Sequence, residues 1–247
     1  MIKNYFRIVI RNISRHKVFN FINITGLAIG MAASLLILLW IEDELAYEKF
    51  NVNAENIYRV EEDQFYSGAR YHVTVTPHPS GPVWKEKIPE IVDQTRLNRL
   101  SRVLFRKDDK VFFESSVVAA DSGLFNIFTL PFLYGDKATA LAAPHSIVLS
   151  EKLADKYFGK SNPVGQTITM ENKYQFTVTG VMKEIPGNSL LTFEGVIPYS
   201  FLKETGAMDE EWGSNSIQTF VQLEKGSDVA GVNNKLTDVV KEYVPET

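Results

Sequence analysis

The longest uninterrupted apolar segment of the sequence covers residues 18–41, which contain no charged side chain. At about 1.5 Å per residue, a helix of that length reaches roughly 36 Å, and the hydrocarbon core of a bilayer is about 30 Å thick. Five basic residues precede the segment, and Glu42, Asp43 and Glu44 follow it directly. Because basic residues favour the cytoplasmic end of a span, the sequence predicts one transmembrane helix with a cytoplasmic N-terminus and an extracytoplasmic domain after it.

A cleaved signal peptide and a buried core helix are the alternatives to a retained anchor. The apolar part of a signal peptide is usually about 7–15 residues long and ends in a cleavage site of small residues. Here the apolar run is longer and ends in Trp40-Ile41, without such a site. An uncharged run of this length is also unusual in the core of a soluble domain. We therefore expect a retained membrane anchor.

Residues 1–17 predict a separate amphipathic basic helix beside the membrane. Apolar and basic residues recur there at helical spacing on two different faces: Ile2, Phe6, Val9 and Ile13 on one, and Lys3, Arg7, Arg11 and Arg15 on the other. A helix of this kind lies in the plane of an anionic membrane surface. The same basic residues are also an ordinary positive flank of the span, and the two interpretations are compatible.

Small residues recur at every fourth position within the span, at Gly26, Gly30 and Ser34. This spacing lets two membrane helices approach closely, although glycine is also simply common in membrane helices. We predict that these three residues form a helix-packing face whose partner is another membrane helix. Asn20 and Asn23 add amide groups that favour a protein partner over lipid.

After the span, the apolar pattern predicts a mixture of strands and helices. Strands are expected over 57–66, 71–76, 94–105, 110–120, 166–170, 174–181, 196–197 and 217–223. Helices are expected over 82–88, 121–128, 151–158 and 229–243. The expected N-caps are Ser80 or Gly81 for the first helix, Asp121 for the second and Ser150 for the third, and Gly159 is the expected C-terminal stop of the third. The alternation over 71–76 is typical of a half-buried strand, and residues 171–173 are the expected turn of a hairpin between 166–170 and 174–181. Strands and helices that do not alternate strictly are typical of the α+β class.

The charge distribution supports this division of the chain. Positions 1–41 contain five of the 26 basic residues and none of the 30 acidic ones, so the remainder is acidic. An acidic domain argues against nucleic acid as a partner, because nucleic acid needs a basic surface. The sequence has no cysteine and 45% hydrophobic residues, so the external domain depends on core burial and not on disulfides.

The sequence contains no motif of a catalytic, cofactor or metal site. The tripeptide Gly159-Lys160-Ser161 resembles the end of a phosphate-binding loop, but Ala154 stands where that motif needs its first glycine. None of the four histidines has the spacing of a zinc ligand set, and no GxSxG frame occurs. We therefore predict a protein that is not an enzyme and that has no cofactor and no metal.

Two histidines and two acidic pairs receive structural interpretations. We expect His72 and His78 to be surface residues, the first on the polar side of a strand and the second in a proline-rich turn. Glu61-Glu62 cannot form an acid–base pair, because neighbours on a strand face opposite sides. The pair at 108–109 is explained by turn chemistry.

Several short blocks follow one another in a characteristic order that covers nearly the whole chain. They are Arg-Asn-Ile-Ser-Arg-His-Lys (11–17), Asn-Ile-Thr-Gly-Leu-Ala-Ile-Gly-Met (23–31), Asp-Glu-Leu-Ala-Tyr-Glu-Lys-Phe (43–50), Ile-Tyr-Arg-Val (57–60), Ser-Ile-Val-Leu-Ser-Glu-Lys-Leu-Ala-Asp-Lys-Tyr-Phe-Gly (146–159), Asn-Pro-Val-Gly (162–165), Val-Thr-Gly-Val (178–181) and Pro-Gly-Asn-Ser (186–189). In this succession the sequence resembles the N-terminal part of an ABC transporter permease of the MacB/FtsX-like type, in the form common among Bacteroidetes. No single block is a catalytic signature.

The resemblance implies an external domain made of two subdomains. Residues 45–120 and 187–247 would form a βαβ-type subdomain, and residues 121–186 would form a mixed subdomain inserted between them. Together with the helix over 18–41, the expected fold is α+β, with a single N-terminal transmembrane helix and a two-subdomain extracytoplasmic domain. Permeases of this family have four membrane helices, three of them after the external domain, so a chain with one span is expected to be a fragment.

The resemblance also implies a permease subunit in the cell inner membrane, engaged in transport or efflux. A cytoplasmic ABC ATPase subunit would supply ATP hydrolysis, which would be coupled to movement of the external domain acting on exported or periplasmic clients. The other implied partners are further permease helices or a second permease copy, and a periplasmic adaptor or a lipoprotein client. No catalytic residue is implied. A stand-alone membrane-anchored binding or sensor domain is the alternative, and an anchored hydrolase is the least favoured hypothesis.

Overall fold

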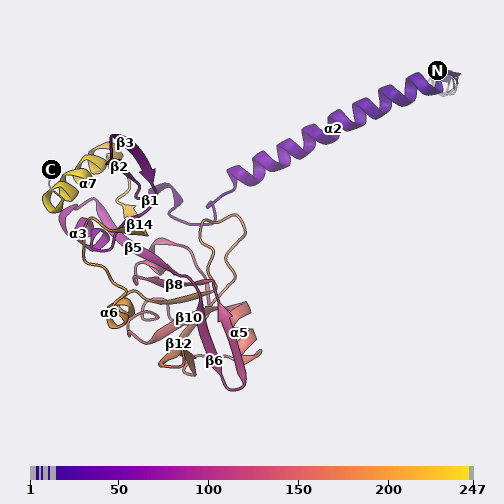
Figure 1. Ribbon diagram of the computed structural model, residues 1–247. Coiled ribbons are helices and arrows are strands. Elements are labelled where there is room, and N and C mark those ends of the chain that lie inside the picture. The colour runs from indigo at the N-terminus through magenta and orange to yellow at the C-terminus, as the bar shows by residue number, and fades with distance from the viewer. Residues whose placement is uncertain (1–3, 6, 8–10, 12–14, 245–247) are drawn as a thin grey trace. The chain divides into compact units, whose positions relative to one another are not determined.

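The computed structural model describes residues 4–5, 7, 11 and 15–244 (Figure 1). The chain divides into two compact units, Met1–Tyr47 and Glu48–Thr247, which we call the first and the second unit. The amphipathic helix that is predicted over 1–17 lies largely outside the described residues, and it stays a prediction.

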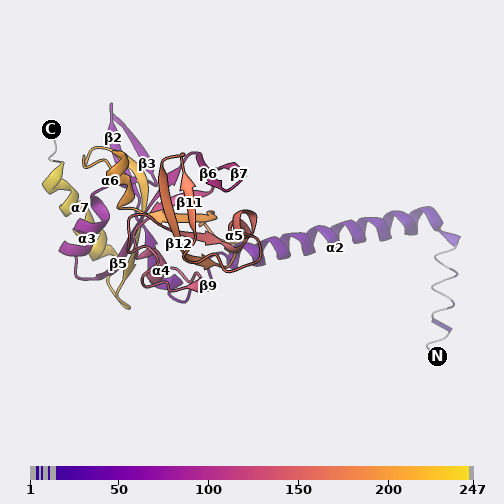
Figure 2. The ribbon, with the colours of Figure 1, turned by 90° about the horizontal axis from the view of Figure 1, so that it is seen from below.

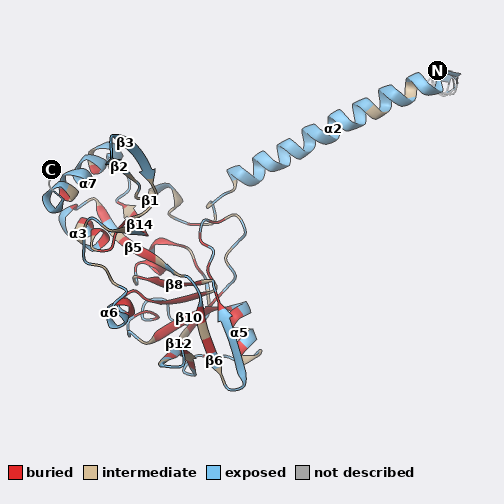
Figure 3. Ribbon diagram, in the orientation of Figure 1, coloured by how far each residue is buried: buried red, intermediate tan, exposed pale blue. Residues whose placement is uncertain are grey.

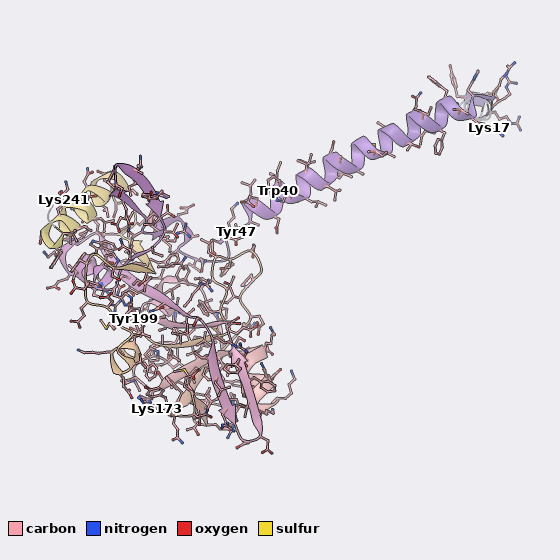
Figure 4. The ribbon with its side chains drawn as sticks, viewed as in Figure 1. Lys17, Trp40, Tyr47, Lys173, Tyr199 and Lys241 are labelled. Atoms are coloured by element: carbon pink, nitrogen blue, oxygen red, sulfur yellow. The ribbon has the colours of Figure 1, made fainter. Side chains whose placement is uncertain are left out.

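The first unit consists mainly of one long helix, α2 (Lys17–Leu45). It contains the predicted span 18–41 and continues through the acidic residues 42–44. The backbone N–H of Ala46 donates to the carbonyls of Glu42 and Asp43, and that of Tyr47 donates to the carbonyl of Glu44. The mean hydropathy of its most apolar window is 2.3, and none of that window is buried. Figure 4 shows side chains on all sides of α2 between Lys17 and Trp40. Among the described residues, α2 is the one helix long and apolar enough to cross a membrane.

The second unit is built on a mixed sheet that contains twelve strands in the described part of the chain. In spatial order these are β1 (Ile57–Arg59), β14 (Asn215–Leu223), β5 (Ile91–Leu100), β8 (Val117–Ala120), β13 (Gly195–Pro198), β10 (Ser146–Ser150), β12 (Tyr174–Met182), β11 (Thr167–Met170), β6 (Val103–Lys107) and β7 (Lys110–Glu114), with β4 (Thr76–Pro77) beside β14 and β9 (Phe132–Gly135) beside β12. The β10–β12 and β8–β13 pairs are parallel. A separate hairpin is formed by β2 (Glu62–Tyr66) and β3 (Ala69–Val73). The predicted α+β class is confirmed.

Short helices cover parts of this sheet. They are α3 (Ser80–Lys87), α4 (Leu124–Ile127), α5 (Glu151–Phe158), α6 (Phe201–Thr205) and α7 (Val229–Tyr243), with a 3-10 turn η1 (Ala54–Asn56) before β1. Helix α3 packs on β5 and β14, and α7 lies beside α3 (Figure 2). Helix α5 packs on β10 and β12, and α4 packs on β5. The bounds of α7 agree with the predicted helix over 229–243.

Apolar side chains form three buried clusters within the second unit. Figure 3 shows buried residues in red along the strands of the main sheet. Representative members are Phe105, Leu149 and Phe176 in the first, Leu124, Phe128 and Phe220 in the second, and Trp84, Val221 and Val232 in the third. Complete burial of one large apolar side chain contributes roughly 1.5–3 kcal/mol. These clusters therefore hold together a domain whose sequence contains no cysteine.

Three local predictions of turn and cap chemistry are confirmed. Ser150 is the N-cap of α5, where its hydroxyl oxygen accepts a hydrogen bond from the backbone N–H of Leu153 at 3.1 Å. Gly159 ends the same helix with a φ of 73°, a conformation that glycine adopts at little cost. The β11–β12 hairpin turns at Glu171 and Asn172, both with a φ of 53°.

Three strands that were predicted as continuous are each divided in two. The strand over 57–66 leaves the main sheet after β1, and its second half pairs with β3. The strand over 94–105 is interrupted at 101–102, and the strand over 110–120 is interrupted at 115–116. On either side of each break the two halves pair with different neighbours. Apolar periodicity continues across the breaks, so it does not reveal the change of partner strand.

Two further local predictions are wrong. The strand over 71–76 was expected to be half-buried, but β3 belongs to the exposed hairpin and Tyr71 is 51% exposed. The N-cap of α3 is Pro79, and Ser80 lies inside the helix. The hydroxyl of Ser80 donates to the carbonyl oxygen of Pro77 at 2.7 Å, so the proline-rich turn uses the group that was expected to cap the helix.

The division of the external domain into two subdomains stays a prediction. Sheet hydrogen bonds join the segments that this division separates, because β13 from 187–247 pairs with β10 from 121–186. In the same way, β6 from 45–120 pairs with β11.

Candidate functional site

The predicted helix-packing residues Gly26, Gly30 and Ser34 lie along one side of α2. With them, three larger apolar residues line a shallow groove on the helix, namely Leu27, Met31 and Leu35. A Cβ placed on Gly26 or Gly30 would meet no atom within 4 Å. The Ser34 hydroxyl donates to the carbonyl oxygen of Gly30 at 2.9 Å, so it is satisfied within its own helix. The groove suits close approach of a second helix, and that use of it stays a prediction.

The tripeptide Gly159-Lys160-Ser161 lies at the C-terminal end of α5. Gly159 ends the helix, and Lys160 forms an ion pair with Asp155 on the preceding turn. A phosphate-binding loop instead precedes a helix and directs backbone N–H groups at the anion. This geometry agrees with the sequence argument against nucleotide binding at this position. Within the described residues there is also no cluster of three or more side chains that could hold a metal ion.

His72 lies on the surface of the β2–β3 hairpin, as predicted. Its two ring nitrogens contact carboxylates, with Nδ1 3.0 Å from Asp63 and Nε2 2.8 Å from Glu61. The hydrogen bond to Asp63, and to a smaller extent the one to Glu61, raises the pKa of His72 above its usual value. Arg59 and Arg70 contact the same two carboxylates from the other side. The hairpin therefore carries a charged cluster whose protonation depends on pH.

The prediction that His78 is a surface residue is wrong, because its side chain is only 2% exposed. Its Nδ1 lies 2.7 Å from the hydroxyl of Tyr199, and its Nε2 lies 3.0 Å from the hydroxyl of Ser216. Desolvation by burial lowers the pKa of His78, which keeps the ring neutral near pH 7. A neutral imidazole has one donor and one acceptor nitrogen, and the two hydroxyls satisfy both.

Arg96 and Asp121 form a buried ion pair that the sequence analysis did not identify. Arg96 donates from Nε and Nη2 to the two carboxylate oxygens of Asp121, each at 2.8 Å. Its Nη1 donates to the carbonyl oxygen of His78 at 2.7 Å, and its guanidinium lies 3.8 Å from the ring centroid of Tyr199. Asp121 was predicted to cap α4, but Gly123 holds that position because the carboxylate is engaged by Arg96.

One sequence signal could have indicated this ion pair. Residues 94–97 of β5 are all buried, and Arg96 is the one charged residue among them. Asp121 directly follows the fully buried strand β8. A buried charge requires an opposite charge nearby, because desolvation is otherwise too costly. The pair joins β5 to the end of β8 and brings the segment containing His78 and the residue Tyr199 to the same place.

A cavity of about 320 Å³ lies between β2, α3 and α7 in the second unit. Glu62 and Asp63 lie on its rim, and Trp84, Leu236 and Val240 line its apolar part. Burial raises the pKa of Glu62 above its usual value, which favours the neutral form of that carboxyl group. The volume lies at the small end of the range typical of small-molecule sites.

The buried ion pair allows a prediction about stability. Replacing Asp121 by asparagine leaves the Arg96 guanidinium buried without its counter-charge, which should reduce the free energy of unfolding by about 3–5 kcal/mol. Urea unfolding of the solubilised protein, followed by tryptophan fluorescence, measures the change. Asp155→Asn, which removes the partner of the 88% exposed Lys160 side chain, is the matched control and should cost less than about 1 kcal/mol. Equal costs for the two variants would contradict the prediction.

The two histidines allow a prediction about pH. Because burial lowers the pKa of His78, the unfolded chain binds its proton first, and stability should fall as the pH drops below about 6.5. The raised pKa of His72 has the opposite sign: its stabilisation is complete below about pH 6.5 and is lost as the pH rises through the folded pKa. The free energy of unfolding is measured between pH 5 and 8. Compared with the wild type, it should fall less on acidification in His78→Gln and more in His72→Gln. A change of the same sign in both variants would contradict this assignment.

Solved structures with the same fold include three transporter-related domains. A domain of a protein assigned as a permease, from Porphyromonas gingivalis, matches with a TM-score of 0.67 and 18% identity, covering 78% of this chain and 83% of that chain. The periplasmic region of MacB from Actinobacillus actinomycetemcomitans matches with a TM-score of 0.54 and 19% identity, covering 68% and 73%. The extracellular domain of the noncanonic ABC-type transporter YknZ from Gram-positive bacteria matches with a TM-score of 0.53 and 18% identity, covering 70% of this chain and 86% of that chain. At these identities the likeness shows a shared fold.

The sequence itself matches a family model. No curated protein sequence matches the chain, but the model of the MacB-like periplasmic core domain matches residues 20–239. The match begins inside the apolar helix α2 and extends into α7, so it includes the membrane helix as well as the sheet. An apolar helix joined to such a domain indicates a membrane-anchored protein with an extracytoplasmic domain. The chain belongs to the family of MacB-like periplasmic core domains found in ABC transporter permeases.

Proposed function

We propose that this chain is the N-terminal portion of the permease subunit of an ABC transporter. In this role it couples ATP hydrolysis by a cytoplasmic partner to movement of the second unit, which acts on exported or periplasmic clients. The observation that supports the proposal most is a single family match that includes an uncovered apolar helix and a mixed-sheet domain. Two structures of the same fold come from MacB and from an ABC-type transporter.

The orientation of the chain is part of the proposal. Five basic residues precede the span and three acidic residues follow it. Basic residues close to a span are retained on the cytoplasmic side. The N-terminus therefore lies in the cytoplasm and the second unit on the opposite side of the inner membrane, in the periplasm of a cell with two membranes.

The source of energy is proposed to be another polypeptide. The only sequence that resembles a phosphate-binding loop in the described residues ends helix α5, where its lysine is paired with Asp155. A domain on the far side of the membrane also has no access to cytoplasmic ATP. The partners that this function requires are a cytoplasmic ABC ATPase and either further permease helices or a second permease copy, for which the groove on α2 is the proposed contact.

A stand-alone anchored binding or sensor domain is the second candidate. The cavity between β2, α3 and α7 supports it, because an apolar pocket with a few polar groups on its rim is typical of ligand sites. This candidate needs no ATPase, so one experiment separates the two. A periplasmic adaptor or a lipoprotein client remains a proposed partner of either form.

Purification of the native complex tests the proposed function. The gene is expressed with its chromosomal neighbours, and the affinity-tagged product is purified in mild detergent and transferred to lipid nanodiscs. The expected result is a stoichiometric ATP-binding subunit and vanadate-sensitive ATP hydrolysis in the purified sample. Repeated recovery of the tagged chain without any ATPase would contradict the proposal and favour the anchored sensor.

The groove on α2 allows a prediction about assembly. Replacing Gly26 and Gly30 together by leucine overpacks a close helix contact, so a helix that packs there should lose about 1–3 kcal/mol of association. Such a loss corresponds to roughly five- to 150-fold weaker association, measured as recovery of partner helices or of a second copy. Ala28→Leu with Ala32→Leu is the matched control, because it adds leucines at the same spacing on another face of α2. Equal recovery with both pairs of substitutions would mean that the groove meets only lipid.

A further inference from the structure

Glu48, the first residue of the second unit, forms hydrogen bonds with the loop at 188–190. Its backbone N–H donates to the carbonyl oxygen of Asn188 at 3.0 Å. Its Oε1 accepts a hydrogen bond from the hydroxyl of Ser189 at 2.8 Å and another from the backbone N–H of Leu190. The side chain of a single residue thus joins segments that are about 140 positions apart in the sequence.

A second contact point lies close to the first. Asn51 donates from Nδ2 to Oε2 of Glu48 at 2.6 Å and accepts at Oδ1 from the backbone N–H of Thr129 at 2.8 Å. The backbone N–H of Val52 donates to the hydroxyl of Thr129 at 2.9 Å. Asn51 is 4% exposed, so its own two bonds are partly shielded from water, whereas the Val52 bond lies at the surface. We call residues 48–52 the entry segment, and it is tied to the second unit at two separate places.

Both places adjoin buried residues of the core. In the loop that contains Ser189, alternate residues point inward: Ser189 and Leu191 are 2% exposed and Phe193 is 4% exposed. This loop leads directly into β13, which pairs with β8 on one side and β10 on the other. At the other place, Phe128 next to Thr129 packs edge-to-face on Phe220 of β14, with ring centroids 5.3 Å apart. The entry segment is therefore attached to the middle of the main sheet.

Glu48 holds this position in an unfavourable backbone conformation. Its φ is 59°, in the left-handed region that residues with a Cβ rarely adopt. Such a conformation persists where the surrounding contacts determine it, and it is common at clamps and switches. Glu171 provides a comparison within the same chain: its φ is 53° and its Oε1 accepts the backbone N–H of Leu104 at 2.7 Å, but it lies in the β11–β12 turn.

We propose that Glu48 is a positioning residue that makes the second unit follow the movement of the membrane helix. A flexible connection absorbs movement through changes in its backbone angles, whereas the entry segment is held at two points and transmits displacement from Tyr47 to the loop at 188–190 and so to β13. This inference rests on the proposed function, because it assigns the route by which the ATP-driven movement enters the external domain.

Hydrogen exchange in the assembled complex tests the inference. The permease with its ATPase is placed in lipid nanodiscs, and amide exchange of residues 186–198 is compared between the nucleotide-free and the ATP–vanadate states. In the wild type this region should show a nucleotide-dependent difference. Glu48→Ala should lose that difference, although the ATPase remains bound and hydrolyses ATP. Glu48→Gln should keep it, because the amide oxygen can still accept from Ser189 and Leu190, although the amide nitrogen gives up the bond from Asn51.

Two further variants separate the proposed role from general stability. Glu171→Ala removes a comparable acceptor from a residue with comparable φ, and it should keep the nucleotide-dependent difference. Glu48→Asp retains the charge but is one methylene shorter, so it should lose the difference, and it replaces Glu48→Ala as the test if the alanine variant does not assemble. A full difference in an assembled Glu48→Ala or Glu48→Asp complex would overturn the inference and leave the proposed function intact. A wild-type chain that binds no ATPase would overturn the proposed function, and the inference with it.

Discussion

The uncovered apolar surface of α2 is the constraint on which the rest of the structure depends. Along this helix nearly every large apolar side chain is exposed; Leu27 and Leu36, for example, each expose 67% of their surface. Each Å² of such surface costs roughly 25 cal/mol in water. None of the most apolar part of α2 is buried by the described residues. A bilayer removes the cost, because a helix satisfies its own backbone hydrogen bonds in hydrocarbon. The second unit begins three residues after α2 ends, so it must work at a membrane surface.

The second unit is held together by one continuous sheet. Its main sheet joins strands from distant parts of the chain, and the parallel pairs β10–β12 and β8–β13 lie at its centre. Strands in parallel pairs are typically buried on both faces, which agrees with the complete burial of β8, β10 and β13. The ion pair of Arg96 and Asp121 connects β5 to the end of β8 within this frame. A movement that reached one strand would therefore be shared by its neighbours, which is what the proposed function requires.

Sequence analysis predicted features that depend on local chemistry and missed those that depend on distant contacts. The span, the Ser150 cap, the turn at Glu171 and Asn172, and helix α7 follow from spacing and residue type within a few positions. His78 was misassigned because the adjacent prolines indicate a turn, while the residues that bury it, Tyr199 and Ser216, come from segments more than 120 positions away. The contacts of Glu48 with the loop at 188–190 were invisible for the same reason. The Gly26, Gly30 and Ser34 face was visible in the sequence, and its packing on another helix stays a prediction.

The central claim is that α2 crosses the membrane with the second unit on the extracytoplasmic side, and cysteine labelling tests it most directly. The natural sequence has no cysteine, so single cysteines at Lys17 and at the exposed Ser161 give an unambiguous signal with a membrane-impermeant maleimide in spheroplasts. The account predicts immediate labelling at position 161 and labelling at position 17 only after the membrane is opened. Labelling of position 17 in intact spheroplasts, with position 161 protected, would contradict it.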